Sequence, residues 1–268
     1  VIPHLARSWK AEPLAVTFEL KQGVKFHDLS ELTAEDVKFS MDRLLEIGEG
    51  SAFLFAGKIE STEVLGTYTV RFNLATSFGP FVPALARLHI LNKDLVMANL
   101  KADGLYGDLG DYGKEYLLTH DAGSGAYMVK EFDFEESIVM ERFPEYFSDV
   151  AENAPDEVVF MQSPDTVTVK TLMARGELEM TDPWQPEEAY VAMDAMEGVE
   201  IAGLLAGELE YLMFHTRRPP TDDAHFRRAL SYLFDYDEAT ASIFPGAAQS
   251  VGPIPHGLPG YKEGLFQY

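Results

Sequence analysis

Residues 16–28 read Val-Thr-Phe-Glu-Leu-Lys-Gln-Gly-Val-Lys-Phe-His-Asp, and Leu32-Thr-Ala-Glu-Asp-Val37 follows shortly after. Apolar and polar residues alternate over 15–20, which predicts a half-buried strand that ends by Gly23. Thr33 predicts the start of a helix, because its side chain can cap the free amides of a first turn. The two acidic residues after it suit the positive end of the helix dipole. A strand, a tight loop and a capped helix therefore follow one another.

The same kinds of pattern predict further elements along the chain. Strands are expected over 67–74 and 157–162, and a hairpin over 127–134 and 137–143. A helix is expected over 165–175, capped by Ser163 or Asp165. A strand is predicted over 209–216, and an amphipathic helix that includes 226–234 follows a polar, proline-bearing connector. The glycine-rich stretches 103–113 and 245–268 are expected to be loops.

Composition restricts the classes of partner. Asp and Glu number 44 against 21 Lys and Arg, so the formal net charge is −23. A nucleic-acid binder needs a clustered basic face, and here only the pairs Arg217–Arg218 and Arg227–Arg228 stand together. The charge therefore argues against nucleic acid and against an anionic membrane surface. It is consistent with a solvated acidic surface, with solubility in a salty medium, or with attraction of cationic ligands.

Motifs for catalysis are weak throughout. The chain has no cysteine, which excludes a catalytic thiol, a thiolate metal site and a disulfide. Its seven histidines do not form the zinc-protease pattern, and no Gly-x-Ser-x-Gly marks a nucleophilic serine. We therefore predict no catalytic residues, no metal and no cofactor. A hydrolase with an unrecognised carboxylate pair stays open, because carboxylates are abundant.

Several segments, taken in order, resemble a known family. The first is the stretch quoted above, residues 16–28 with 32–37. The others are Leu5-Ala-Arg-Ser-Trp9, Ser124-Gly-Ala-Tyr127, Gly176-Glu-Leu-Glu179, Leu212-Met-Phe-His-Thr216 and Phe226-Arg-Arg-Ala-Leu230. Together they resemble extracellular solute-binding proteins of family 5, which bind oligopeptides, dipeptides, nickel complexes and related solutes. Leu29 stands where the family usually has glycine, which questions the conformation of that turn.

The resemblance implies an α/β fold like that of periplasmic binding proteins, with two lobes (class II, cluster C type) and mixed sheets flanked by helices. Residues 1–208 would form most of lobe one, 209–216 a hinge strand, and 217–268 the beginning of an incomplete lobe two. The chain would then be truncated at both ends. In such a protein a ligand lies between lobes that close by hinge bending. His27 and Asp28 would belong to a structural loop.

The implied function is that of the substrate-binding component of an ABC importer, which passes an oligopeptide or similar solute to a membrane permease. A monomer in the periplasm or outside the cell is expected, with a lipid anchor as a further option. The alternatives are the hydrolase named above and a ligand-sensing regulatory domain with the same fold.

Five residues are the expected ligand contacts. Trp184 lies in a proline-flanked loop and is suited to stacking, and the neighbouring Asp182 is suited to holding a cationic group. Arg87 and His89 follow a segment that approaches the ligand in relatives, and an arginine can bind a carboxylate with two hydrogen bonds. Phe55 would line a wall of the site, with packing in the core as its alternative.

Overall fold

The alternating residues 15–20 form a central strand of an antiparallel sheet in the computed structural model. This strand is β2 (Ala15–Leu20), and it pairs with β1 (Ala6–Glu12) and with β4 (Thr69–Leu74). With β3 (Ile59–Gly66) on the outer side of β4, the sheet has the order β1-β2-β4-β3. The structure describes residues 2–162, 165–203, 208–244, 247–258 and 260–265. The chain divides into two units, Val1–Pro164 and Asp165–Tyr268, each described here by itself.

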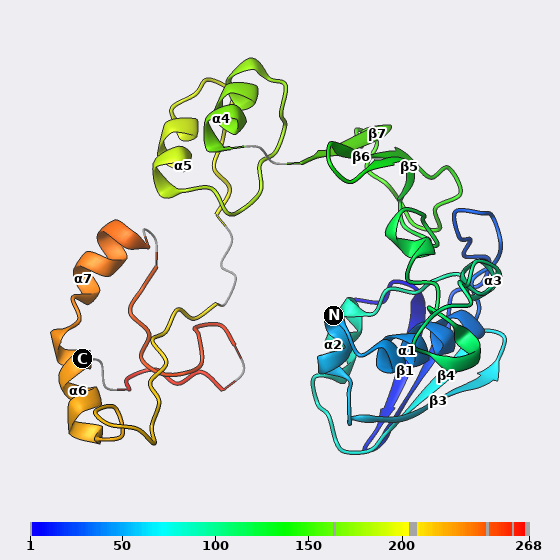
Figure 1. Ribbon diagram of the computed structural model, residues 1–268, viewed down its shortest axis with the longest axis horizontal. Helices are drawn as coiled ribbons and strands as arrows, with labels where there is room; N and C mark the ends of the chain where they lie inside the picture. The colour runs from blue at the N-terminus through cyan, green and yellow to red at the C-terminus, as the bar shows by residue number, and fades with distance from the viewer. Residues whose placement is uncertain (1, 163–164, 204–207, 245–246, 259, 266–268) are drawn as a thin grey trace. The chain divides into compact units, whose positions relative to one another are not determined.

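The core of the first unit lies between this sheet and helix α1 (Ala34–Ile47) (Figure 1). The strand predicted over 67–74 is confirmed as β4, with Val70, Phe72 and Leu74 buried. From α1, Val37 and Met41 are also buried in this core. Gly48 ends the helix in the left-handed conformation that a glycine adopts readily, at φ 71°.

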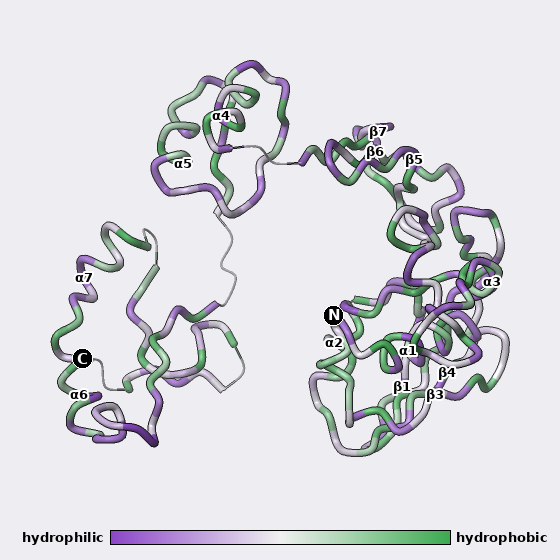
Figure 2. The backbone as a smooth tube through the Cα atoms, viewed as in Figure 1, coloured by the Kyte–Doolittle hydropathy of each residue, from purple (hydrophilic) through white to green (hydrophobic). Residues whose placement is uncertain are grey.

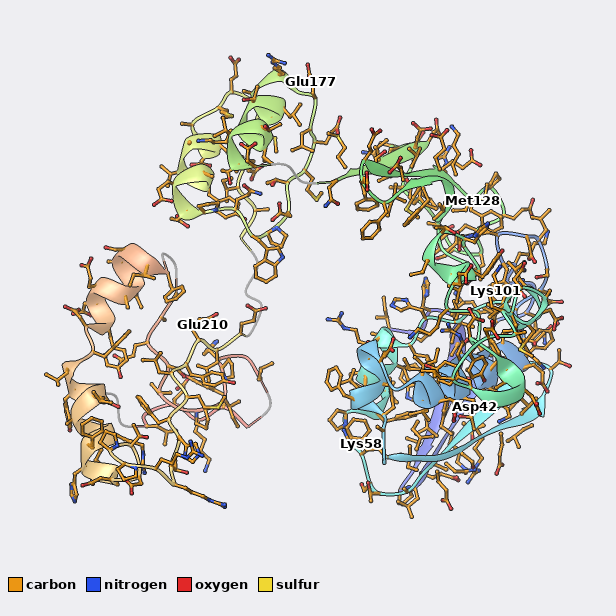
Figure 3. All side chains as sticks on the ribbon, viewed as in Figure 1. Asp42, Lys58, Lys101, Met128, Glu177 and Glu210 are labelled. Atoms are coloured by element: carbon orange, nitrogen blue, oxygen red, sulfur yellow. The ribbon has the colours of Figure 1, made fainter. Side chains whose placement is uncertain are left out.

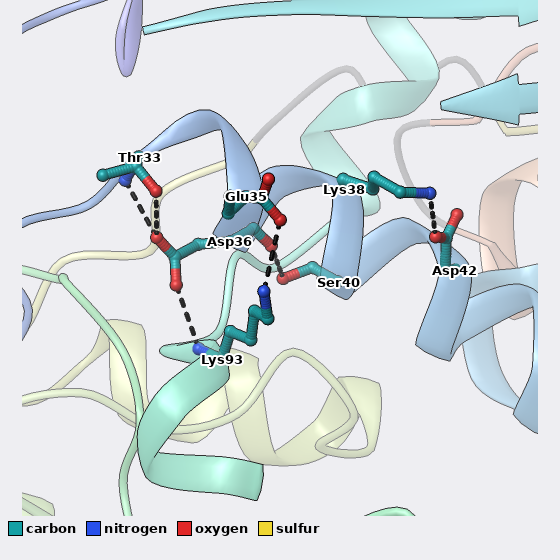
Figure 4. A network of polar contacts seen from close by, with 7 residues as sticks. All are labelled: Thr33, Glu35, Asp36, Lys38, Ser40, Asp42 and Lys93. Carbon is teal, nitrogen blue, oxygen red and sulfur yellow. Dashed lines mark hydrogen bonds and ion pairs between the residues drawn. The ribbon is translucent and has the colours of Figure 1, made fainter. Parts of the chain in front are cut away.

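A charged residue fixes the start of α1. Asp36 is 8% exposed, and one of its carboxylate oxygens accepts hydrogen bonds from both the N–H and the hydroxyl of Thr33, each at 2.9 Å. The other oxygen accepts the N–H of Lys93 at 3.0 Å, at the start of α3 (Lys93–Ala98) (Figure 4). One carboxylate therefore supports the first turns of two helices.

A second antiparallel sheet follows in the first unit, with the order β5-β6-β7. The predicted hairpin and the strand after it are confirmed as β5 (Tyr127–Asp133), β6 (Ser137–Arg142) and β7 (Glu157–Met161). Short helical segments that sequence patterns did not predict complete the unit: Gly50–Leu54, α2 (Phe81–Ala84), Leu85–Arg87, Gly107–Leu109 and Tyr116–Leu118.

The second unit is helical in the residues described. Its elements are α4 (Thr166–Arg175), α5 (Glu187–Asp194), α6 (Ala224–Leu233), α7 (Tyr236–Glu238) and a π-helical turn at Ala239–Ile243. Asp165 caps α4 as one of the two predicted alternatives, by accepting the N–H groups of Val167 and Thr168. The other alternative, Ser163, lies outside the described residues. A small core forms around Val169 and Met193.

The predicted strand over 209–216 is contradicted, because this segment has no regular secondary structure. Its apolar residues Tyr211, Leu212 and Met213 are 67%, 70% and 81% exposed. A strand forms only when a neighbour accepts and donates its backbone hydrogen bonds, and none of the described residues does so here. The division into 1–208, a hinge and 217–268 stays a prediction.

Hydrophobic and hydrophilic residues alternate at short intervals along the chain (Figure 2). Accordingly, none of the helices in the described ranges has both the length and the apolar composition that a membrane crossing requires.

Replacing Asp36 with alanine is expected to lower the free energy of unfolding by about 2–3 kcal/mol, because three partly buried donors lose their acceptor. Asp42, on the same helix, provides the matched control. Its carboxylate is 41% exposed and pairs only with Lys38, so Asp42→Ala is expected to cost less than about 0.5 kcal/mol. Urea denaturation of both variants measures the difference, and equal losses would contradict the role of Asp36.

Candidate functional site

The loop after β2 is held to a distant segment by one imidazole ring. His27 Nδ1 lies 2.5 Å from Asp121 Oδ2, and His27 Nε2 lies 3.0 Å from the carbonyl oxygen of Gly125. The His27 side chain is 10% exposed and that of Asp121 20%. The backbone N–H of His27 also donates a hydrogen bond to the carbonyl oxygen of Gly123 at 3.0 Å. His27 therefore joins two of the segments identified in the sequence, residues 16–28 and Ser124–Tyr127.

Both partners of the ring accept hydrogen bonds and cannot donate them. An imidazole donates from both nitrogens only when it is protonated, so the contacts to Asp121 and Gly125 describe a cationic His27. Burial alone lowers the pKa of His27. The hydrogen bonds to Asp121 and Gly125, with the negative charges of Asp121 and Asp28, outweigh burial and raise the pKa above its ordinary 6.5.

Asp121 shows the opposite balance. Burial alone raises its pKa, but the hydrogen bond from His27, the N–H of Gly123 and the positive charge of His27 lower it below its ordinary 3.8. A further N–H, that of Val129 on β5, donates to Asp121 Oδ2 at 3.2 Å. The carboxylate therefore also holds the start of the second sheet.

The neighbouring Asp28 has a structural role as well. Its Oδ1 accepts from the N–H and the hydroxyl of Ser30, and its Oδ2 accepts from the side-chain amide of Asn92 at 2.7 Å. Leu29, between Asp28 and Ser30 in the sequence, has a φ of 73°, a conformation that glycine adopts more readily. The unusual residue at this turn is therefore accommodated in the left-handed region, with its side chain 58% exposed.

In the second unit, Trp184 and Asp182 form one local structure. Asp182 Oδ1 accepts the N–H of Trp184 at 2.7 Å, and Oδ2 accepts the side-chain amide of Gln185 at 2.7 Å. These hydrogen bonds, first that from Trp184, lower the pKa of Asp182. The carboxylate thus shapes the loop, while the indole of Trp184 is 84% exposed and open to a ligand.

The remaining expected contacts lie in the first unit, and the structure separates them into two groups. Arg87 and His89 are exposed, and within the described residues neither side chain has a hydrogen bond or ion pair. Phe55 is fully buried, with its ring packed edge-on against Phe81 at 6.4 Å. Phe55 thus takes the alternative role in the core, because the helical turn at Gly50–Leu54 directs it inward.

Among the described residues, no group of three or more His, Asp or Glu side chains is arranged to hold a metal ion. Of the expected contacts, Trp184, Arg87 and His89 are exposed, the first in the second unit and the other two in the first.

A sequence model of the bacterial extracellular solute-binding proteins, family 5, matches residues 1–268. The chain belongs to this family. A probable D,D-dipeptide-binding periplasmic protein of Escherichia coli, DdpA, is 31% identical over 98% of this family 5 chain and 50% of its own length. The dipeptide-binding protein of the same organism is 28% identical, over 100% of this chain and 52% of its own length. This family 5 chain spans about half the length of these curated relatives.

Solved structures confirm the predicted fold class. A putative peptide-binding protein AppA from Clostridium difficile superposes with a TM-score of 0.80 at 22% identity, over 98% of this family 5 chain and 53% of its own. The periplasmic binding protein DppA from Helicobacter pylori, in complex with the peptide STSA, has a TM-score of 0.73 at 24% identity, over 99% and 54%. The fold is therefore the mixed α/β fold of periplasmic binding proteins.

The sequence predicted a structural loop at His27 and Asp28, and the structure agrees. It did not identify Asp121, which lies 94 residues away. No local pattern marks an aspartate as the partner of a distant histidine, since the pair is created only when the second sheet packs beside the loop.

The charged pair predicts how stability depends on pH. Because the pKa of His27 is raised on folding, the stability that His27 contributes is fully present below pH 6.5. It is lost as the pH rises through the pKa of the folded state. Because that of Asp121 is lowered, its contribution is present above 3.8 and is lost as pH falls through the folded pKa. The advantage of the wild type over a His27→Gln, Asp121→Asn double variant in free energy of unfolding is therefore expected to be largest between pH 3.8 and pH 6.5. We expect it to reach roughly 2–3 kcal/mol there.

Urea denaturation of both proteins across this pH range measures the gain. The comparison cancels the other carboxylates, which both proteins share. A difference that does not change with pH would contradict the cationic His27.

Proposed function

We propose that this chain is about half of the substrate-binding component of an ABC importer, which captures an oligopeptide or similar small solute between two lobes and delivers it to a membrane permease. The observation that supports this proposal most directly is the family match over residues 1–268. In this role the protein binds and releases a solute without chemical change, in the periplasm or outside the cell.

Peptides are the favoured class of solute. Di/tripeptide-binding protein 2 of Pseudomonas aeruginosa is 27% identical over 99% of this chain, in addition to the dipeptide-binding relatives above. Peptide capture requires groups that recognise a backbone and its termini together with surfaces that tolerate varied side chains. Arg87 is exposed and has no ion pair with any described residue, so it suits a peptide carboxylate, to which a guanidinium donates two parallel hydrogen bonds.

Trp184 is proposed as the aromatic contact of the second unit. Its loop is shaped by Asp182, so the indole is displayed by a fixed backbone and little ordering is needed when a ligand binds. Asp182 therefore acts through Trp184 as a positioning residue, because each of its carboxylate oxygens accepts a hydrogen bond from the loop that displays the indole.

Native mass spectrometry of the full-length protein, purified without refolding, is expected to show a retained solute, with peptides as the leading class. Thermal shift across peptide and metal-chelate panels provides the parallel measurement, because a ligand that binds only the folded state raises the melting temperature. No retained solute together with no shift from either panel would contradict capture. Turnover of a peptide that a single carboxylate substitution abolishes would favour the hydrolase instead.

In the full-length protein, Trp184→Ala is expected to weaken binding of the retained solute about tenfold, because the stacking surface is lost. Its melting temperature in the absence of solute is expected to stay unchanged, since the indole is 84% exposed. Phe134→Ala is the matched control, because this ring is 81% exposed in the turn between β5 and β6. Isothermal titration calorimetry decides, and equal affinities for the two variants would contradict the role of Trp184.

A further inference from the structure

The first unit contains a cavity of about 330 Å³ that none of the expected ligand contacts lines. Its wall is apolar on one part and polar on another. The apolar lining is Phe26, Leu95, Ala122, Met128 and Val129, and the polar lining is His27, Asp28, Tyr116, His120 and Asp121. Met128 lies on β5, at the start of the second sheet (Figure 3). The cavity is thus built where the His27 loop meets this sheet.

The charges on the wall do not cancel. Asp28 and Asp121 place two carboxylates on the wall, and only that of Asp121 is paired with His27. The same two carboxylates act on Tyr116. Its pKa is raised first by burial and then by the charges of Asp121 and Asp28. The lining thus places the carboxylate of Asp28, at the exposed side of the cavity, near apolar walls.

The wall also has unused hydrogen-bonding capacity. Within the described part of the chain, the Tyr116 hydroxyl and His120 Nε2 have no partner. Asp28 Oδ2 accepts one hydrogen bond, from Asn92, although a carboxylate oxygen can accept about two. The rings of Tyr116 and His120 are stacked, with centroids 4.5 Å apart and planes inclined by 16°.

We propose that this cavity binds a small organic cation, with its ammonium group at Asp28 and Tyr116 and its apolar part against Leu95, Met128 and Val129. The volume accommodates a molecule of a few heavy atoms. None of the proposed peptide contacts lines this cavity, so the probes and variants used to test it differ from those that test peptide capture. An inorganic cation fits less well, because half of the lining is apolar and no three metal-binding side chains gather among the described residues.

Three probes with the same four-carbon chain test the charge preference in the intact protein: n-butylammonium, n-butanol and n-butyrate. Methyl NMR is expected to show saturable shifts for n-butylammonium at Leu95, Met128 and Val129. The affinity for n-butanol is expected to be at least about fivefold lower, and n-butyrate is expected to leave these methyl signals unchanged. Equal binding of the three probes, or shifts that never saturate, would overturn the proposal.

Two variants test the polar wall. Asp28→Asn is expected to weaken n-butylammonium binding about fivefold, whereas Asp42→Asn, on α1 outside the cavity, is expected to leave it unchanged. The second comparison separates a site from general attraction by an acidic protein. Should Asp28→Asn lower the melting temperature, Tyr116→Phe decides, because it removes only the hydroxyl and is expected to weaken binding measurably. Unaltered affinity in Tyr116→Phe, or the same loss in Asp42→Asn, would overturn the site.

Discussion

The imidazole of His27 joins two parts of the chain that lie 94 residues apart. One nitrogen donates to the carboxylate of Asp121 and the other to the carbonyl of Gly125, so the loop after β2 and the start of β5 share one cation. The two sheets of the first unit have no strand pairing between them. Their connection at this point therefore depends on a half-buried charge with two acceptors, in surroundings where an unpaired partner is strongly destabilising.

Carboxylates elsewhere in the same unit act in a similar way. Asp36 supports the starts of α1 and α3, and Asp28 holds Ser30 and Asn92. In the second unit Asp182 shapes the loop of Trp184. An excess of acidic residues thus includes several that organise backbone amides, because an ionised carboxylate accepts several strong hydrogen bonds at once. The acidity of the chain is part of its architecture as well as of its surface.

The residues that hold the backbone and the residues proposed to contact a solute are mostly different side chains. In each unit polar networks hold the backbone in place, and the residues expected to meet a ligand are exposed: Arg87 and His89 in the first unit and Trp184 in the second. Membership of family 5 and peptide-binding relatives give this arrangement its proposed use, and the relatives are about twice as long as this chain.

The sequence by itself determined the elements whose patterns are local. The alternation of 15–20, the cap at Thr33, and the hairpin of β5 and β6 were all predictable, because each depends on neighbours a few residues away. The family followed from ordered motifs. Only the tertiary structure decided that Phe55 belongs to the core, that 209–216 forms no strand among the described residues, and that Asp121 is the partner of His27. These outcomes depend on which distant segment supplies a packing surface, a paired strand or a charge, and no short-range pattern in a sequence contains that information.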